Sequence, residues 1–331
     1  MQTLWSIYHC EIPAFILEMA NTPAMLRLKG VGMHCGCEYA SLPQYIGAKP
    51  YSRWVHSVGV ALIVWHFTGD RTQTVAGLLH DIASPAFAHA VDFLHGDYIA
   101  QESTEDETEA IISGSAELKA LLAKYGLTVA EVCDYHMYPV ADNDSPRLSA
   151  DRLEYTLGNA LGLGQAEPDE LRAIYEDLVI AQNEEGQPEL QFRSETHALR
   201  FAQLSLTNSR IYSCDGNRFV MQALADILRA AVEKGALAET DLYSTEADVI
   251  RRLESDAFLA ARWAHYTQYA NLRRSDTRPA DGYWVNIDAK RRHIDPMVAG
   301  AGRVTALCPE YAKALNHYRS ESYDYWITAE I

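Results

Sequence analysis

Apolar residues recur with helical spacing along most of this chain. Residues 54–67 are almost all apolar, and the length of this stretch favours a buried helix over a strand. A second helix is expected at residues 72–80, with Thr72 as its N-cap and an end before Pro85. The same reasoning predicts further helices at 105–113, at 115–124, from Thr128 to about His136, from Ser149 onward, and at 195–212, 219–234 and 245–253.

One segment breaks the helical pattern. Residues 178–192 alternate between apolar and polar side chains around a central turn signal, which predicts a β-hairpin. After Arg278 the chain is punctuated by Gly and Pro, and there we expect a strand at 283–288 and a last helix. We therefore expect an all-α fold with a small β-hairpin insertion, made of a core over residues 1–235 and a helical extension over 236–331 that packs on it.

The composition is that of a globular protein with an acidic surface. Hydrophobic residues make up 48% and charged residues 22% of the 331 residues, so a packed core is expected. The formal net charge is −17, from 28 Lys and Arg against 45 Asp and Glu. Because this charge would repel both a nucleic-acid backbone and an anionic membrane surface, we expect no nucleic acid and no membrane among the partners.

Neither a targeting segment nor a disulfide framework is indicated. The first residues lack a basic stretch followed by an apolar one, and every apolar stretch is too short or too interrupted to span a bilayer. Six cysteines are scattered through a large chain, which favours reduced thiols and a cytoplasmic location. The segment His34-Cys35-Gly36-Cys37 has ligand-type side chains, but no second pair with zinc-site spacing accompanies it, so we interpret it as ordinary thiols.

Four side chains suggest a metal site. His56 lies within the apolar stretch, His80 and Asp81 are adjacent where the second helix ends, and Asp151 falls in the first turn of a later helix. Two imidazoles and two carboxylates suit a divalent transition metal such as Mn, Fe, Ni or Zn, and Mg less well. With open coordination positions, such an ion can activate water and polarise a phosphoryl oxygen. Taken singly, each residue has a simpler interpretation, since a lone His in an apolar helix usually belongs to the core.

The surroundings of these four residues resemble those in a known enzyme superfamily. Residues 53–60 read RWVHSVGV, residues 78–89 read LLHDIASPAFAH, and residues 151–155 read DRLEY. These segments are similar to the H…HD…D signature of the HD-domain phosphohydrolases, and more narrowly to the deoxynucleoside triphosphate triphosphohydrolase branch. The segment NTPAMLRLK at 21–29 and, more weakly, KRRHIDP at 290–296 extend the resemblance over most of the chain. It implies the HD-domain helical fold and a metal held by the four residues.

Two arginines are expected to bind phosphate. Arg53 lies one helical turn before His56 on roughly the same face, and its planar guanidinium suits phosphate, although a surface ion pair is the simpler alternative. Arg152, beside Asp151, matches a basic position that contacts phosphate in the resembling enzymes. We therefore expect the substrate phosphate to lie between these arginines and the metal.

The other expected contacts involve two tyrosines and a histidine. Tyr155 matches a residue that packs on the substrate sugar, although a Tyr at this spacing is equally consistent with the core. Tyr212 is expected to contact the substrate through a weaker part of the resemblance. His89 matches a histidine that acts near the scissile phosphate, and an ordinary pKa of about 6.5 suits acid or base chemistry. Catalysis is thus expected to depend on His89, Arg53 and Asp81.

Some positions depart from the resembling enzymes. Ser84 stands where a further catalytic histidine is usual, and its hydroxyl can bind phosphate but cannot shuttle a proton at neutral pH. The nearest match to a downstream His-Glu pair is Asp106-Glu107, within an acidic run that is otherwise a solvated helix face. His136 is either a ligand of a second metal or a hydrogen-bonded, partly buried histidine. Asn159 replaces a sugar-sensing aspartate, so the identity of the substrate stays open.

The sequence therefore predicts a metal-dependent phosphohydrolase that acts on a small phosphate ester. The first expectation for the substrate is a deoxynucleoside triphosphate, and the second is a nucleoside monophosphate or another phosphoester, which extra carboxylates in the pocket would favour. The alternative from another class is a nucleotide-binding regulatory protein with weak or no turnover, which Ser84 supports. We also expect a homo-oligomer, with the apolar tail at 323–331 as a candidate subunit contact.

Overall fold

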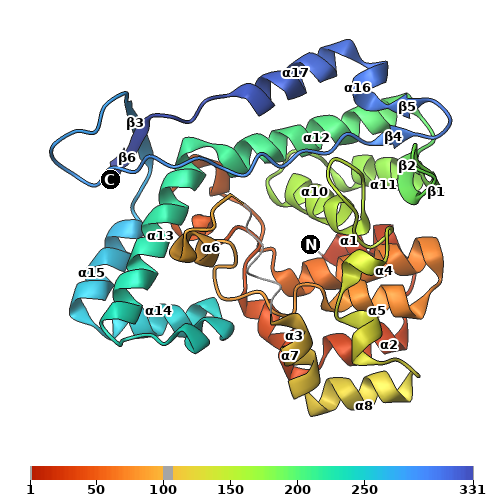
Figure 1. Ribbon diagram of the computed structural model, residues 1–331, viewed down its shortest axis with the longest axis horizontal. Helices are drawn as coiled ribbons and strands as arrows, with labels where there is room; N and C mark the ends of the chain where they lie inside the picture. The colour runs from red at the N-terminus through yellow and green to blue at the C-terminus, as the bar shows by residue number, and fades with distance from the viewer. Residues whose placement is uncertain (1, 100–106, 331) are drawn as a thin grey trace.

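The computed structural model of the chain describes residues 2–99 and 107–330, most of which lie in helices (Figure 1). The first half contains α1 (Gln2–Tyr8), α2 (Ala14–Ala20), α3 (Pro23–Leu26), α4 (Arg53–Thr68), α5 (Arg71–Leu79), α6 (Ala90–His95), α7 (Thr108–Gly114), α8 (Ala116–Lys124), α9 (Val129–Val132) and α10 (Ala150–Gly162). The second half contains α11 (Pro168–Glu176), α12 (Glu195–Ser213), α13 (Asp215–Glu233), α14 (Glu246–Glu254), α15 (Ala257–Tyr266), α16 (Val304–Leu307) and α17 (Pro309–Ser320). Short 3₁₀ helices lie at Arg27–Gly30, Cys37–Tyr39, Pro43–Tyr45, Tyr135–Met137 and Glu239–Tyr243. Among the described helices, none has the length and apolar character needed to cross a bilayer.

Two small sheets supplement the helices. They consist of β1 (Leu178–Gln182), β2 (Pro188–Phe192), β3 (Asn271–Ser275), β4 (Met297–Val298), β5 (Gly302–Arg303) and β6 (Trp326–Glu330). β1 and β2 form the expected antiparallel hairpin, in which Gly186 adopts a φ of 74° at the turn. β2 also pairs in parallel with β4, which pairs with β5, while β3 and β6 form a separate antiparallel pair. The fold is therefore mainly helical as expected, but it is not all-α, because segments far apart in the C-terminal third pair as strands.

Two local predictions are wrong. Helix α5 is capped by Asp70 and not by Thr72, because the Asp70 carboxylate accepts a hydrogen bond from a backbone N–H of the first turn. Residues 283–288 form no continuous strand, and a single isolated bridge joins Val285 to Ile327.

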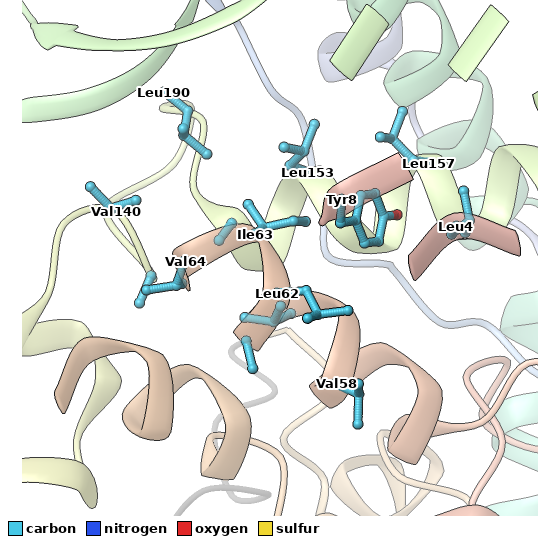
Figure 2. Close-up of a cluster of buried hydrophobic side chains, with 14 of the residues drawn as sticks. Leu4, Tyr8, Val58, Leu62, Ile63, Val64, Val140, Leu153, Leu157 and Leu190 are labelled. Carbon is cyan, nitrogen blue, oxygen red and sulfur yellow. The ribbon is translucent and has the colours of Figure 1, made fainter. Parts of the chain in front are cut away.

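Helix α4 passes through the first hydrophobic cluster and is surrounded by other helices. Figure 2 shows Val58, Leu62, Ile63 and Val64 of α4 together with Leu4, Tyr8, Val140, Leu153, Leu157 and Leu190. Ser52 caps the helix through its side chain, and Gly69 ends it with a φ of 62°. Burying each large aliphatic side chain contributes about 1.5–3 kcal/mol, so this packing fixes α4 and the residues that it carries.

A second hydrophobic cluster surrounds α13 and includes residues of α6 and α15. Leu228 and Trp263 both belong to it, so apolar residues from both sides of residue 235 contribute. The division into a core and an extension at that residue stays a prediction. Ile327 of β6 is completely buried in the same cluster, so the apolar tail is used within this chain, and the expected homo-oligomer also stays a prediction.

Candidate metal centre

Three helices bring the four expected metal ligands together. His56 lies one turn into α4, and His80 and Asp81 follow directly after α5. Asp151 lies in the first turn of α10, which Ser149 caps through its side chain. Because α4 packs against both α5 and α10, ligands that are far apart in the sequence meet at one place.

The ligand atoms form a compact cluster. His56 Nε2 lies 3.0 Å from Asp151 Oδ1 and 3.2 Å from His80 Nε2, which is itself 3.6 Å from that Asp151 oxygen. Asp81 Oδ2 lies 3.7 Å from the His56 nitrogen and 3.6 Å from the His80 nitrogen. Ligands placed about 2.0–2.2 Å from a tetrahedral ion are about 3.3 Å apart, so these spacings fit a single divalent ion.

Asp81 gives the clearest sign of metal binding. Its Oδ1 accepts hydrogen bonds from Arg53 Nη1, at 2.5 Å, and from Ser84 Oγ, at 2.8 Å. Its Oδ2 is buried and has no hydrogen-bond partner among the described residues. A buried carboxylate oxygen left unpaired is costly, so the orientation of Asp81 fits a cation shared with His56 and His80.

The charges of the two aspartates also fit a cation. Burial alone raises the pKa of Asp81, but the Arg53 guanidinium and the rings of His80 and His56 hold it well below its usual range. Burial likewise raises the pKa of Asp151, but the hydrogen bond with His56 lowers it below its usual value. Both carboxyl groups are therefore ionised at neutral pH and can serve as oxygen ligands.

Arg53 and Ser84 were both expected to contact the substrate, and they occupy different positions. Arg53 lines a pocket beside the candidate ligands and also donates a hydrogen bond to Asp81. Ser84 is completely buried against Asp81 and is not among the described residues that line the pocket. Ser84 therefore orients Asp81, a candidate metal ligand, and its contact with the substrate stays a prediction.

His89 is held at the pocket by an unusual backbone segment. Phe87 and Ala88 have φ angles of 64° and 43°, a region that non-glycine residues rarely occupy. His89 Nδ1 lies 2.9 Å from Asp92 Oδ2, and its Nε2 lies 3.4 Å from Arg292 Nη2. Burial lowers the pKa of His89 to about 4, and although Asp92 opposes this shift, the Arg292 guanidinium adds to it. A neutral ring that donates from Nδ1 keeps a lone pair on Nε2, which faces the Arg292 guanidinium at the pocket.

The four candidate ligands line a pocket of about 570 Å³, a volume typical of sites for small molecules. Residues from both hydrophobic clusters contribute to its wall, so the pocket lies between them. Ala289, Lys290 and Arg292 also line it, and they belong to the segment that connects β3 to β4 (Figure 1). The C-terminal third of the chain is therefore part of the site.

Helix α10 presents one row of side chains to the pocket. Asp151, Tyr155 and Asn159 are spaced four residues apart, so they share one face of the helix, and all three line the pocket. Arg152 lines it as well, and its Nη1 lies 2.9 Å from Asp142 Oδ1. Tyr155 packs on the first hydrophobic cluster and also lines the pocket, so its contact with a substrate sugar stays a prediction.

A neutral hydrogen-bond network lines the pocket next to Tyr155. Asn159 Nδ2 donates to the carbonyl oxygen of Tyr155 and to the Tyr212 hydroxyl, both at 2.8 Å. These bonds fix the amide orientation, so Asn159 Oδ1 accepts the hydrogen bond from His34 Nε2 at 3.0 Å. Burial lowers the pKa of His34, so this ring is neutral. Tyr212 donates its own hydrogen to none of the described residues and can donate it to a ligand.

The residues whose roles the sequence left open have different surroundings. His136 lines the pocket, and its nitrogens lie 3.0 Å from Asp134 Oδ1 and 3.4 Å from Asp142 Oδ2. Its role as a second-metal ligand stays a prediction. Glu107 is exposed and precedes α7, while Asp106 lies outside the described residues.

One contact of the cluster was not anticipated from the sequence. Glu154 is completely buried, and its Oε2 lies 2.5 Å from His56 Nδ1, the nitrogen turned away from the other ligands. An acidic residue three positions after Asp151, on the buried side of the same helix, was the available signal. His34 and Arg292 were missed as pocket residues because irregular segments carry them, and their placement depends on the tertiary structure.

Comparison with known proteins also supports a metal-dependent phosphohydrolase. No family model matches the chain. It is 27% identical over 301 residues to the metal-dependent phosphohydrolase cns2 of Cordyceps militaris, covering 86% of this chain and 80% of that protein. It is 23% identical over 248 residues to the uncharacterized protein YdhJ of Bacillus subtilis, covering 74% of this chain and 72% of that protein. The first of these distant relatives, together with the His and Asp cluster, supports the HD-domain phosphohydrolase superfamily, a divalent metal and a phosphate-containing substrate.

Proposed function

We propose that this protein is a metal-dependent phosphohydrolase whose substrate is a nucleotide, with a nucleoside monophosphate preferred to a triphosphate. The observation that supports it most directly is the unpaired Oδ2 of Asp81 beside His56 and His80, in a pocket that Arg53 and Arg152 also line. When bound, a divalent ion such as Mn, Fe, Ni, Zn or Mg supplies polarisation of a phosphoryl oxygen and a more acidic water.

The residues around the cluster would orient the phosphate and move a proton. Arg53 and Arg152 would hold phosphate oxygens, since a guanidinium can bind two oxygens at once. Hydrolysis forms a bond from the water oxygen to phosphorus and breaks the bond from phosphorus to the leaving oxygen. His89, with its lone pair on Nε2, would accept the proton that the attacking water gives up, and the leaving oxygen would take a proton from solvent.

The charges of the pocket support a short phosphate chain. Its described lining contains nearly as many acidic as basic side chains: Asp81, Asp142, Asp144 and Asp151 against Arg53, Arg152, Arg218, Lys290 and Arg292. A phosphomonoester carries about two negative charges at neutral pH, which one divalent ion offsets. A triphosphate brings about two further charges into the same nearly balanced lining. The deoxynucleoside triphosphate, which the sequence placed first, therefore becomes the second choice.

Helix α10 supports a nucleotide by its spacing. At about 1.5 Å per residue, Asn159 lies about 12 Å along the helix from Asp151, with Tyr155 midway. A phosphate beside Asp151 would place a sugar against the Tyr155 ring and a base near His34 and Tyr212. This order of charged, aromatic and neutral hydrogen-bonding groups matches the phosphate, sugar and base of a nucleotide.

Metal content and product release together test the proposal. Purified protein is supplied with Mn²⁺ and assayed with nucleoside monophosphates and deoxynucleoside triphosphates for released phosphate or triphosphate. We expect phosphate from a monophosphate, and Asp151→Ala should lose both the bound metal and hydrolysis. Asp144→Ala is the matched control for metal content, because Asp144 lines the same pocket outside the ligand cluster. An active, metal-replete Asp151→Ala variant would overturn the proposal.

Measuring the melting temperature beside product release separates the enzyme from the regulatory alternative. A nucleotide that raises the melting temperature of the protein without releasing any product would favour a binding protein, whereas turnover of any nucleotide excludes it.

A further inference from the structure

The buried carboxylate of Glu154 connects His56, one of the candidate metal ligands, to two buried tyrosines. Its Oε2 lies 2.5 Å from His56 Nδ1 and also accepts a hydrogen bond from the Tyr51 hydroxyl. Its Oε1 lies 3.5 Å from the hydroxyl of Tyr8, which ends α1. All four side chains are buried, so this carboxylate is held by donors from three different segments.

Two glycines inside helices make room for this arrangement. A Cβ at Gly59 of α4 would lie 2.6 Å from Glu154 Oε1, and a Cβ at Gly158 of α10 would overlap the Tyr51 hydroxyl oxygen. Gly in a helix interior costs about 0.5–1 kcal/mol relative to Ala. Both glycines are thus required for Glu154 and Tyr51 to approach the helices this closely.

The contact with Glu154 determines which nitrogen of His56 can bind an ion. A carboxylate only accepts, so His56 Nδ1 carries the hydrogen of the bond to Glu154, and Nε2, which faces His80 and Asp151, is the nitrogen left to bind an ion in place of its contact with Asp151. His80 is oriented in the same way, because its Nδ1 lies 2.7 Å from the carbonyl oxygen of Gly77. A carboxylate partner fixes the ring and also makes the opposite nitrogen a stronger donor to a metal.

We propose that Glu154 is a positioning residue of the metal site, which orients His56 while Tyr51 holds Glu154 in place. This inference rests on the proposed metal-dependent function, because it concerns how tightly the same cluster binds its ion. Without the carboxylate, the His56 ring can turn or change the nitrogen that carries its proton, and the ion is held less firmly. Loss of such a partner weakens metal binding by about 10- to 100-fold.

The test is calorimetric titration of the metal-free protein with Mn²⁺. We expect Glu154→Gln to weaken Mn²⁺ binding by about 10- to 100-fold while circular dichroism shows a folded protein. Glu189→Gln is the matched control, because Glu189 is also completely buried and charge-paired, with Arg303, but is not among the described residues that line the pocket. Its Mn²⁺ affinity should equal that of the unmodified protein even if its melting temperature falls.

Tyr51→Phe keeps the proposal testable if Glu154→Gln does not fold. It removes one hydrogen bond to Glu154 and leaves the ring, so we expect Mn²⁺ affinity to fall by about two- to tenfold. In the zinc-loaded protein, the His56 Nδ1 proton should give a downfield NMR resonance that Tyr51→Phe shifts, which a purely structural role would not do.

The possible failures are distinguishable. Unchanged Mn²⁺ affinity in both variants, or in Tyr51→Phe when the other does not fold, would overturn the role of Glu154 and leave the proposed function standing. An unmodified protein that binds no Mn²⁺ would overturn the proposed function, and the role of Glu154 with it.

Discussion

Arg53 forms a buried ion pair with Asp81, one of the four candidate metal ligands, and its Nη1 lies 2.5 Å from Asp81 Oδ1. Removing one partner of such a pair costs about 3–5 kcal/mol, because the remaining charge stays buried and uncompensated. We expect Arg53→Gln to lower the free energy of unfolding of the metal-free protein by about this amount, measured by urea denaturation. Added Mn²⁺ should restore part of the loss, since the ion also offsets Asp81.

A surface pair provides the contrast for this experiment. Arg251 pairs with Asp248, and the Arg251 side chain is 70% exposed, so Arg251→Gln should leave the free energy of unfolding unchanged within error. If Arg53→Gln were as stable as Arg251→Gln in the absence of metal, the buried pair would not be a major determinant of stability.

His89 is expected to act as a base over a wide pH range. Because its pKa is lowered to about 4, chiefly by burial, the ring stays unprotonated at mildly acidic pH and gains a proton only near pH 4. We expect His89→Asn to reduce kcat by about 10²- to 10⁴-fold. With saturating Mn²⁺, kcat of the unmodified enzyme should show no protonation step of His89 near pH 6.5. A step at that pH that His89→Asn abolishes would show that the histidine has an ordinary pKa.

The buried carboxyl groups of Glu38 and Glu246 are expected to make the stability of the protein depend on pH. Burial raises the pKa of both carboxyl groups, and repulsion from Glu38 raises that of Glu246 further. As the pH rises above the usual carboxyl range, the unfolded chain loses these protons before the folded protein does, so stability falls towards neutral pH. Glu38→Gln should therefore stabilise the protein by about 1 kcal/mol at pH 8 and little at pH 4.5, as measured by calorimetric melting.

The Glu38→Gln comparison has a built-in check. Glu38 Oε2 has no hydrogen-bond partner among the described residues, so replacing that oxygen with an amide nitrogen removes no identified hydrogen bond. An equal change of melting temperature at both pH values would indicate a packing effect and not a raised pKa.

Gly59→Ala is expected to have the opposite sign from an ordinary helix substitution. Ala normally stabilises a helix interior relative to Gly by up to about 1 kcal/mol. At Gly59 the new Cβ would lie 2.6 Å from Glu154 Oε1, so we expect a destabilisation of about 1–3 kcal/mol and weaker Mn²⁺ binding. Gly114→Ala in α7 is the control, since nothing lies within 4 Å of its added Cβ. A stabilised Gly59→Ala variant with full Mn²⁺ affinity would contradict the tight packing of Glu154.

Local signals in the sequence predicted much of the fold. The hairpin at 178–192 was expected because alternation and the turn at Gly186 both lie within a few residues of each other. The pairing of β3 with β6 was not, because 50 or more residues separate the strands and neither has a strong alternating pattern. In the strand expected at 283–288, only Val285 forms a bridge, to Ile327 of β6, which also pairs with Arg274 of β3.

Residues of the candidate site also differ in whether local sequence signals could predict them. His56, His80, Asp81 and Asp151 could be predicted because each lies in a short motif on or beside a helix, and the structure brings them together. Arg292 comes from a segment without regular structure, more than a hundred residues after Asp151, and only the tertiary fold places it next to His89. The candidate metal ligands and the pocket residues on or beside helices could therefore be predicted from local motifs, whereas the pocket residues carried by irregular segments could not.

The segment between β3 and β4 has a consequence for how this protein can change over time. It contributes Ala289, Lys290 and Arg292 to the pocket, yet it contains none of the four candidate metal ligands. Substitutions at these three positions would alter the size and charge of the space offered to a substrate and leave the candidate ligands on α4, on α10 and directly after α5 in place. Variation at Lys290 and Arg292 would therefore change which phosphate esters fit the pocket without replacing any candidate ligand.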